Sequence, residues 1–322
     1  MYSIVIPVYN EEKHIVSLIE SILKSNFKNY EIIVVDDNSK DSSIEKIKNY
    51  DVKIIKLKEN SGAARARNIG AKFAKGDAIL FLDSDVVVHE DTLFQIDKTF
   101  REKKDAKAVI GMYSKNPVNK GFFPKFKALL DYYIFTSPKS EKVTSFEPRC
   151  GAVKKELFEE INGFDEKFRG ATVEDYEFGY RLLKKADIYI NKNAQVDHNF
   201  DGFKKTARNF LKRGYMWFQM FLKRKKFDNV GTTQGTAFFR GFAFLSLILL
   251  ISSLFYFNLI YLAALSFIIS IFGNIKFYRL ILKETNIIFL LKAIFVDYIL
   301  SILLGISAVA AIITYPFKAK NI

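Results

Sequence analysis

The sequence predicts an α/β domain built on a doubly wound sheet, followed by an α-helical membrane region. Two observations carry this prediction. From residue 1 to about 115, short apolar runs alternate with amphipathic stretches, which is the pattern of strands joined by crossover helices. Between Arg240 and Lys276 no charged residue occurs, and a stretch of that length suits a bilayer. Hydrophobic residues make up 49% of the chain and charged residues 26%, so the two kinds are segregated.

Five short apolar or β-branched runs are predicted strands, at 3–7, 31–36, 53–57, 78–83 and 108–113. The stretches between them are predicted helices, at 11–24, 41–49, 62–74 and 91–103. A strand, a crossover helix and a further strand form the repeating unit of a parallel sheet, whose ligands bind beyond the carboxyl ends of the strands. Residues 116–200 are less regular and are expected to complete a domain that spans 1–200.

A basic stretch with interleaved aromatic residues follows, at 201–235. Apolar residues recur there at helical spacing, and lysines and arginines lie between them, which is typical of a helix in a membrane interface. Residues 236–322 are predicted membrane helices, two to four in number, with three expected. The uncharged run suits two spans with a turn near Asn258, and a third candidate covers 287–317. Within the third, Lys292 and Asp297 are costly at mid-bilayer, so its first part lies at the interface or the two residues pair across a turn.

The positive-inside rule places the basic run 223–226, and the 1–200 domain with it, on the cytoplasmic side of a multi-pass cell-membrane protein. Three crossings would export the tail that carries Lys318 and Lys320. The formal net charge is +14, which suits an anionic membrane surface, a phosphorylated substrate or nucleic acid. Because the basic residues concentrate beside the apolar helices, a membrane surface is favoured and no nucleic-acid partner is expected. The single cysteine, Cys150, indicates a reducing compartment, and the apolar start reads as a buried strand, not as a signal peptide.

The sharpest motif is the run Asp83-Ser84-Asp85 at the exit of a predicted strand. Two carboxylates one residue apart can bind Mg²⁺ or Mn²⁺ and leave coordination positions for diphosphate oxygens. The alternative is a solvated turn that caps the next helix.

Three further segments lie at comparable places. Asp36 and Asp37 end another predicted strand, where a carboxylate can bind a base or ribose or simply cap a helix. Small residues at 61–70 allow a helix amino end to approach a ligand, and Arg67 can reach an anion; the alternative is an ordinary helix start. After a glycine turn at Gly170, Glu174 and its neighbours form an acidic helix start that can supply a general base.

Taken in order, these segments resemble glycosyltransferase family 2, inverting enzymes whose catalytic domain has the GT-A fold, a Rossmann-like fold that binds nucleotide-diphospho-sugars. The resemblance rests on Ile4-Val5-Ile6-Pro7-Val8-Tyr9-Asn10-Glu11-Glu12, Val34 to Ser39, Gly62 to Gly70 and Leu80 to Asp85. It covers about residues 1–200, and the four motifs together are far more specific than any one of them.

The resemblance implies a role for each matching residue. The residues implied to bind base and ribose are Pro7, Tyr9, Glu11 and Asp37, and Arg67 is implied to lie near the phosphates. The implied ligands of the metal and diphosphate are Asp83 and Asp85, with Ser84 between them, and His198 falls where many relatives carry a histidine near the metal. Gly151 is implied to line the sugar and acceptor pocket. Asp175 matches the catalytic base, and Glu174 supports it. A divalent cation, Mg²⁺ or Mn²⁺, is the implied cofactor. For His198 a purely structural role is the alternative.

The implied function is transfer of a sugar from a nucleotide-sugar donor to a membrane lipid or lipid-linked glycan. A polyprenyl phosphate is the alternative acceptor; it is already an anion, so Asp175 would orient it. The run Arg213-Gly214-Tyr215-Met216-Trp217 lacks the glutamine and the adjacent Arg-Trp of processive synthases, and no membrane span is seen before the 1–200 domain; both points favour single-sugar transfer. A non-catalytic membrane scaffold or transporter subunit is the alternative from another class.

Overall fold

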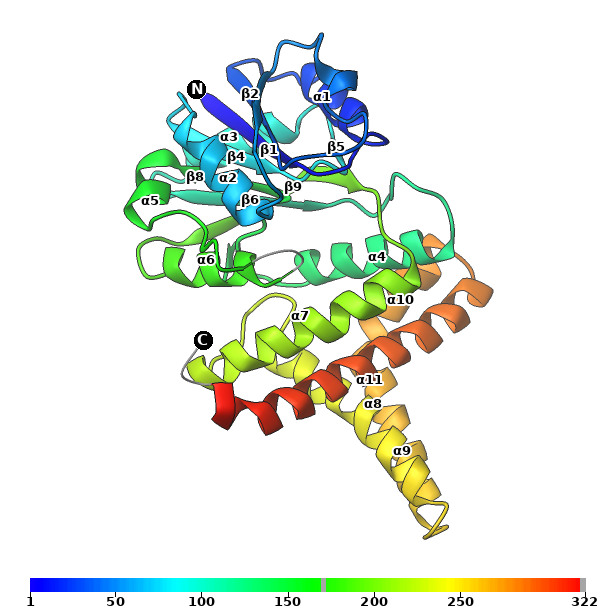
Figure 1. The fold of residues 1–322 in the computed structure, drawn as a ribbon. Helices are drawn as coiled ribbons and strands as arrows, with labels where there is room; N and C mark the ends of the chain where they lie inside the picture. The colour runs from blue at the N-terminus through cyan, green and yellow to red at the C-terminus, as the bar shows by residue number, and fades with distance from the viewer. Residues whose placement is uncertain (169–171, 319–322) are drawn as a thin grey trace. The chain divides into compact units, whose positions relative to one another are not determined.

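The computed structural model describes residues 1–168 and 172–318, and the chain forms two compact units (Figure 1). The first unit comprises Met1–Lys120 and Ile134–Phe200, and the second comprises Gly121–Tyr133 and the chain from Asp201 onward. The turn expected at Gly170 and the tail residue Lys320 lie outside the described residues.

Among the described residues, nine strands of the first unit form one mixed sheet in the order β3-β2-β1-β4-β8-β6-β9-β5, with β7 paired to β9. The strands are β1 (Tyr2–Val8), β2 (Tyr30–Asp36), β3 (Lys53–Lys56), β4 (Ala78–Leu82), β5 (Val86–Val88), β6 (Ala108–Tyr113), β7 (Lys142–Val143), β8 (Cys150–Lys154) and β9 (Ile188–His198). Strands β1 to β4 run parallel. Their carboxyl ends therefore meet at one edge.

The five predicted strands are all confirmed to within two residues at either end, but the sheet is not parallel throughout. Strand β8 lies between β4 and β6 and is antiparallel to both, and β5 is antiparallel to β9. The less regular region therefore supplies strands to the middle of the sheet, which the sequence pattern did not reveal.

The helices of the first unit are α1 (Ile15–Leu23), α2 (Ala63–Lys72), α3 (Thr92–Glu102), α5 (Lys155–Glu160) and α6 (Glu174–Leu182). The helix predicted at 41–49 is wrong: only a 3₁₀ turn at Glu45–Ile47 forms there. The reason is local competition, because Ser43 and Asp41 accept hydrogen bonds from the backbone N–H groups of Glu11 and Glu12 and hold the segment as a loop.

The second unit contains α7 (Phe203–Arg224), α8 (Gln234–Ser252), α9 (Leu259–Gly273), α10 (Ile275–Glu284) and α11 (Ile287–Lys318). Helix α4 (Phe122–Thr136) crosses the boundary between the units. Two helices, Gln234–Ser252 and Ile287–Phe317, are long and apolar enough to span a membrane, and the pair α9 and α10, bent by 62°, passes the same test as one segment. The turn expected near Asn258 falls between α8 and α9.

The pairing of Lys292 with Asp297 across a turn is wrong. Helix α11 is continuous through both residues, and Lys292 is exposed whereas Asp297 is buried. Asp297 instead lies 3.5 Å from the guanidinium of Arg240 and accepts a hydrogen bond from the Tyr278 hydroxyl.

Candidate active site

The loops after β1 and β2 are tied together at the carboxyl edge of the sheet. The backbone N–H of Asn10 donates to Ser39 Oγ over 3.0 Å, and the Asn10 side chain accepts from the N–H of Lys40 over 2.7 Å. Pro7 is buried within β1, whereas Tyr9 is 45% exposed just beyond it. An exposed aromatic ring therefore stands at this edge, where the base-binding role was expected.

Asp37 anchors the start of α2. Its two carboxylate oxygens accept the backbone N–H groups of Ser61 and Gly62 at 2.7 and 2.8 Å, and its side chain is buried. Gly62 has a φ of 90°, a conformation that suits glycine. Asp37 thus fixes the loop beside the edge, and its expected contact with base or ribose stays a prediction.

Arg67 holds the centre of the site. The residue is only 4% exposed, and its guanidinium lies 2.7 Å from Asp83 and 3.3 Å from Glu174. Burial alone would lower the pKa of Arg67, but the charges of Asp83 and Glu174 outweigh it and the pKa is raised. The arginine therefore remains a cation. In this structure it pairs with carboxylates, and its expected place near the phosphates stays a prediction.

Asp175 joins the same group of charges. It lies in the acidic first turn of α6, is buried, and is close enough for its charge to raise the pKa of Arg67. Thr172 Oγ1 donates to the second oxygen of Glu174 over 2.9 Å and fixes that carboxylate. The end of β4 and the start of α6, about ninety residues apart in the chain, are thereby brought together around one guanidinium.

Asp85 faces His198, with 3.1 Å between Asp85 Oδ2 and His198 Nε2. Burial acts to raise the pKa of Asp85, but the hydrogen bond and charge of His198 outweigh it and hold that pKa below its usual value. Strand pairing explains the proximity, because Val86 of β5 lies opposite His198 of β9. Between the two aspartates, Ser84 is buried.

The aspartates of the Asp83-Ser84-Asp85 run therefore have different partners. Asp83 turns to Arg67 and Asp85 to His198, and within residues 1–168 and 172–318 no three His, Cys, Asp or Glu side chains form a metal-binding group. The pair Asp85 and His198 nevertheless fits a divalent cation, since Mg²⁺ is commonly held by one or two carboxylates while substrate phosphates and water supply the other ligands. Asp83, Glu174 and Asp175 together carry more charge than Arg67, around which they lie, and this excess of negative charge favours a cation.

Gly151 is required by close packing within the protein. A Cβ atom there would lie 2.5 Å from the carbonyl oxygen of Glu147 and 2.8 Å from the ring of Phe146. Gly151 pairs with Phe81, and Cys150 with Leu82, so this strand lies directly beside the β4 end that carries Asp83. Cys150 is fully buried, and burial raises the pKa of its thiol to about 12.

A stack behind His198 was not predicted. The Tyr113 ring lies parallel to the imidazole with 4.5 Å between centroids, and the Arg149 guanidinium lies 4.0 Å from the centre of the Tyr113 ring. Such contacts orient a histidine by packing and cation–π attraction. Tyr113 stands at the end of a predicted strand, the only signal that pointed to it; Thr172 had none.

The mixed α/β sheet, the Asp-x-Asp run at a strand end and the acidic helix that faces it define a glycosyltransferase catalytic domain of the GT-A type. The model of the family described as Glycosyl transferase family 2 matches residues 3–162. A Streptococcus pneumoniae protein named Glycosyltransferase GlyG is 33% identical over 218 residues, which cover 61% of this chain and 70% of that protein. This chain belongs to glycosyltransferase family 2.

Other relatives match over smaller or different shares. An uncharacterized glycosyltransferase of Haemophilus influenzae is 30% identical over 58% of this chain and 63% of its own length. The poly(ribitol-phosphate) beta-N-acetylglucosaminyltransferase TarS of Staphylococcus aureus is 36% identical over 99 residues, 29% of this chain and 17% of TarS. Among solved structures, GalNAc-T7 with UDP, GalNAc and Mn²⁺ has a TM-score of 0.50 at 18% identity, covering 62% of this chain and 44% of that one; this likeness concerns the fold alone.

Proposed function

We propose that the protein is an inverting glycosyltransferase that moves a sugar from a nucleotide-sugar donor to a membrane-associated acceptor, a lipid or a lipid-linked glycan. One observation carries the proposal: the buried Arg67 joins Asp83, from the donor end of the sheet, to Glu174, next to the expected base. Donor and acceptor groups of the family motif then face one site. The scaffold alternative does not explain why a buried cation would gather these carboxylates.

The catalytic step in this proposal is a single displacement. Asp175 takes the proton of an acceptor hydroxyl while that oxygen attacks the anomeric carbon from the face opposite the diphosphate. The bond from that carbon to the diphosphate oxygen breaks, and the nucleoside diphosphate leaves with its electron pair. Glu174 holds the acceptor side in place. General-base assistance of this kind is worth about 10²- to 10⁴-fold in rate.

Donor binding is assigned to the opposite side of the same site. Pro7, Tyr9, Glu11 and Asp37 would hold the base and ribose, and Ser84 and Gly151 line the path to the sugar. Asp85 and His198 would hold a divalent cation, with Asp83 beside it. When bound, such a cation neutralises charge on the departing diphosphate.

The acceptor is assigned from the helical unit. Helices long and apolar enough for a bilayer would bring the chain to the surface where lipid-linked acceptors are found. Two relatives are named for a poly(ribitol-phosphate) and for minor teichoic acid biosynthesis, TarS and the GgaB protein of Bacillus subtilis. A polyprenyl phosphate is the second candidate acceptor, favoured by the same helices. With that acceptor Asp175 orients the phosphate, and removal of the Asp175 carboxylate lowers the transfer rate less than with a hydroxyl acceptor.

We place the first unit on the cytoplasmic side of the cell membrane, because the basic run 223–226 covers the end of α7 and the positive-inside rule favours that side. Anionic lipid is then the surface that α7 meets. The multi-pass arrangement expected from the sequence is one way for the apolar helices to enter the bilayer.

The test is transfer by membranes that contain the full chain, incubated with labelled UDP-, GDP- and dTDP-sugars and a divalent cation. We expect label in the lipid or lipid-linked fraction with one of these donors. Asp175→Asn and Asp83→Ala should each reduce transfer by at least about 10²-fold if a hydroxyl is the acceptor, while the exposed control Asp51→Asn keeps it. Full activity in either site variant contradicts the assignment.

A further inference from the structure

We propose that the helical unit inserts into the bilayer from one face only: α11 lies in the membrane plane beside α7, and α8 and α9 form a hairpin that enters the hydrocarbon and returns without crossing. The partner surface is thus a single leaflet. This arrangement differs from the multi-pass one expected from the sequence, and it does not depend on the proposed enzymatic activity.

Helices α7 and α11 are in close contact. Gln219 of α7 donates to the carbonyl oxygen of Ala311 over 3.0 Å, and Ser307 of α11 donates to the carbonyl oxygen of Leu211 over 3.0 Å. At Gly214 a Cβ atom would lie 2.9 Å from Leu304, so the two backbones approach closely. Leu211 lies at Ser307 and Gln219 lies at Ala311, so the two helices run in the same direction, and Figure 1 shows α7 and α11 side by side. The tilt of one therefore fixes the tilt of the other.

Helix α7 carries exposed positive charge near both of its ends. Its exposed cations run from the first turn to the last, at Lys204, Lys205, Arg208, Lys212 and Lys223. Lys204 and Lys223 are about 29 Å apart along the helix axis, close to the thickness of the hydrocarbon core. A crossing α7 with these two lysines at opposite faces would place the exposed Arg208 and Lys212 inside the hydrocarbon, which is unfavourable. Helix α7 therefore lies along the interface, and α11 beside it does too.

Helix α11 has an exposed apolar surface. Its exposed apolar side chains form a stripe that includes Ile288, Leu291, Phe295, Val309, Ile313 and Phe317. At 100° per residue this stripe lies on the side of α11 opposite Leu304, Ser307 and Ala311, which contact α7. Helix α11 thus has a basic helix on one side and an exposed apolar face on the other. That is the pattern of a helix lying in an interface.

The hairpin of α8 and α9 is shorter than the hydrocarbon core is thick. Between Arg240 and the end of α8 the helix extends about 18 Å, and the 15 residues of α9 extend about 22 Å. Both values fall short of a hydrocarbon core of about 30 Å. The tip, Leu254 to Phe257, is 70–82% exposed and carries no charge. An uncharged apolar tip at the end of a short hairpin suits the bilayer interior better than the far aqueous surface.

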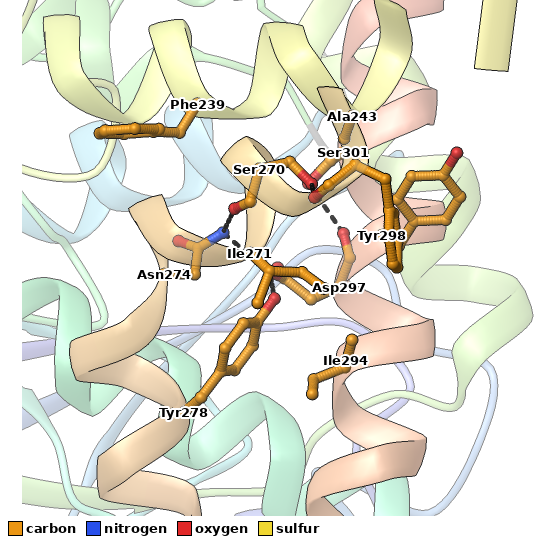
Figure 2. A pocket seen from close by; sticks show the side chains of 11 residues that line it. Phe239, Ala243, Ser270, Ile271, Asn274, Tyr278, Ile294, Asp297, Tyr298 and Ser301 are labelled. Atoms are coloured by element: carbon orange, nitrogen blue, oxygen red, sulfur yellow. Dashed lines mark hydrogen bonds between the residues drawn. The ribbon is translucent and has the colours of Figure 1, made fainter. Parts of the chain in front are cut away.

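The polar cluster at the base of the hairpin agrees with this depth. Figure 2 shows Asn274, at the bend between α9 and α10, and Tyr278, in the first turn of α10, turned toward Asp297 of α11, with oxygen-to-donor distances of 3.2 and 2.9 Å. Arg240 reaches the other oxygen of Asp297 at 3.5 Å. In a crossing α11, Asp297 would lie about 15 Å below the helix start, at mid-bilayer. When α11 lies in the membrane plane, Asp297 lies at the depth of the lipid headgroups.

Incomplete hydrogen bonding in this cluster points the same way. Among the described residues, Nε and Nη1 of Arg240 and Oδ1 of Asp297 have no hydrogen-bond partner. The cavity beside Asp297 measures about 10 Å³, room for about one water molecule. Polar groups with unfilled hydrogen-bonding capacity are tolerated where water reaches them, as it does near the headgroups.

The test is cysteine labelling of the full chain in spheroplasts and in inverted vesicles with a membrane-impermeant maleimide. Three variants carry one added cysteine each: Lys205→Cys on α7, Asn258→Cys at the hairpin tip, and a cysteine appended after Ile322. Wild type is the matched control, because its buried Cys150 should stay unlabelled while the protein is folded. We expect the appended cysteine to label from the same membrane face as Lys205→Cys, and Asn258→Cys to label from neither face until detergent is added.

Labelling of the appended cysteine from the face opposite Lys205→Cys would overturn the in-plane placement of α11. Labelling of Asn258→Cys from either face of intact membranes would overturn the buried hairpin. If Asn258→Cys exposes Cys150, which indicates misfolding, Ser253→Cys at the same tip replaces it and decides the point.

Discussion

Arg67 pairs with Asp83 and Glu174 while its guanidinium is almost completely buried. A buried cation of this kind is stabilised only by the carboxylates around it, and those carboxylates would repel one another without it. The residue therefore supports both the link between α2 and the start of α6 and the placement of the candidate catalytic groups.

We expect Arg67→Met to lower the free energy of unfolding by about 3–5 kcal/mol, because it leaves buried carboxylates unpaired. Arg67→Lys should lower it less, since it keeps the charge but loses the planar fork that reaches two carboxylates. Arg65→Met is the matched control on the same helix: the Arg65 side chain is 43% exposed and its closest ion pairs measure 3.8 and 3.9 Å, so a change of at most about 1 kcal/mol is expected. Denaturant unfolding of the full chain in detergent measures all three, and equal stability of Arg67→Met and Arg65→Met would contradict this reading.

At the residue scale the sequence located the acidic motifs but not their partners. The order of Asp37, Asp83, Asp85 and Asp175 along the chain was enough to find the family, because each stands at a strand end or helix start. The bond between Arg67 and Glu174 joins residues 107 positions apart, and no local pattern encodes it. For the same reason the stack of Arg149 and Tyr113 behind His198 could not be predicted.

At the scale of elements, periodicity located strands β1 to β4 and β6 and three of the four helices expected between them, the exception being the one at 41–49. It failed where strand order departs from chain order. Strand β8 enters the sheet between β4 and β6, and a five-residue strand in a region rich in turns carries little sign of its neighbours. The short β5 and the loop at 41–49 were missed because hydrogen bonds from side chains and distant strands outweigh local propensity.

Helix α2 packs closely on the sheet through Gly70. A Cβ atom there would lie 2.4 Å from Val5 Cγ1 and 3.1 Å from Val35 Cγ2. We expect Gly70→Ala to lower stability, because overpacking typically costs about 1–3 kcal/mol and exceeds the gain in helix propensity of up to about 1 kcal/mol. Thermal unfolding of the full chain measures the effect, with Gly202→Ala, where no atom lies within 4 Å, as the control. A Gly70→Ala variant as stable as wild type would contradict the close packing.

At the scale of the whole molecule, the segregation of charged and apolar residues correctly predicted a helical region after the α/β domain. The sequence could not show how that region meets the membrane. Hydropathy finds helices, such as α11, that are long enough to cross a membrane. It gives no sign that α7, which carries exposed cations, packs against α11. Only the contacts of α7 with α11 carry that information.

Carboxylates far apart in the chain are proposed to serve one sugar-transfer site, with the diphosphate and the acceptor on opposite faces of the sugar. The most direct test is the anomeric configuration of the transferred sugar, determined by NMR on the product formed with whichever donor the protein uses. A single displacement at one site predicts a configuration inverted relative to the donor. Retention of the donor configuration would contradict the account.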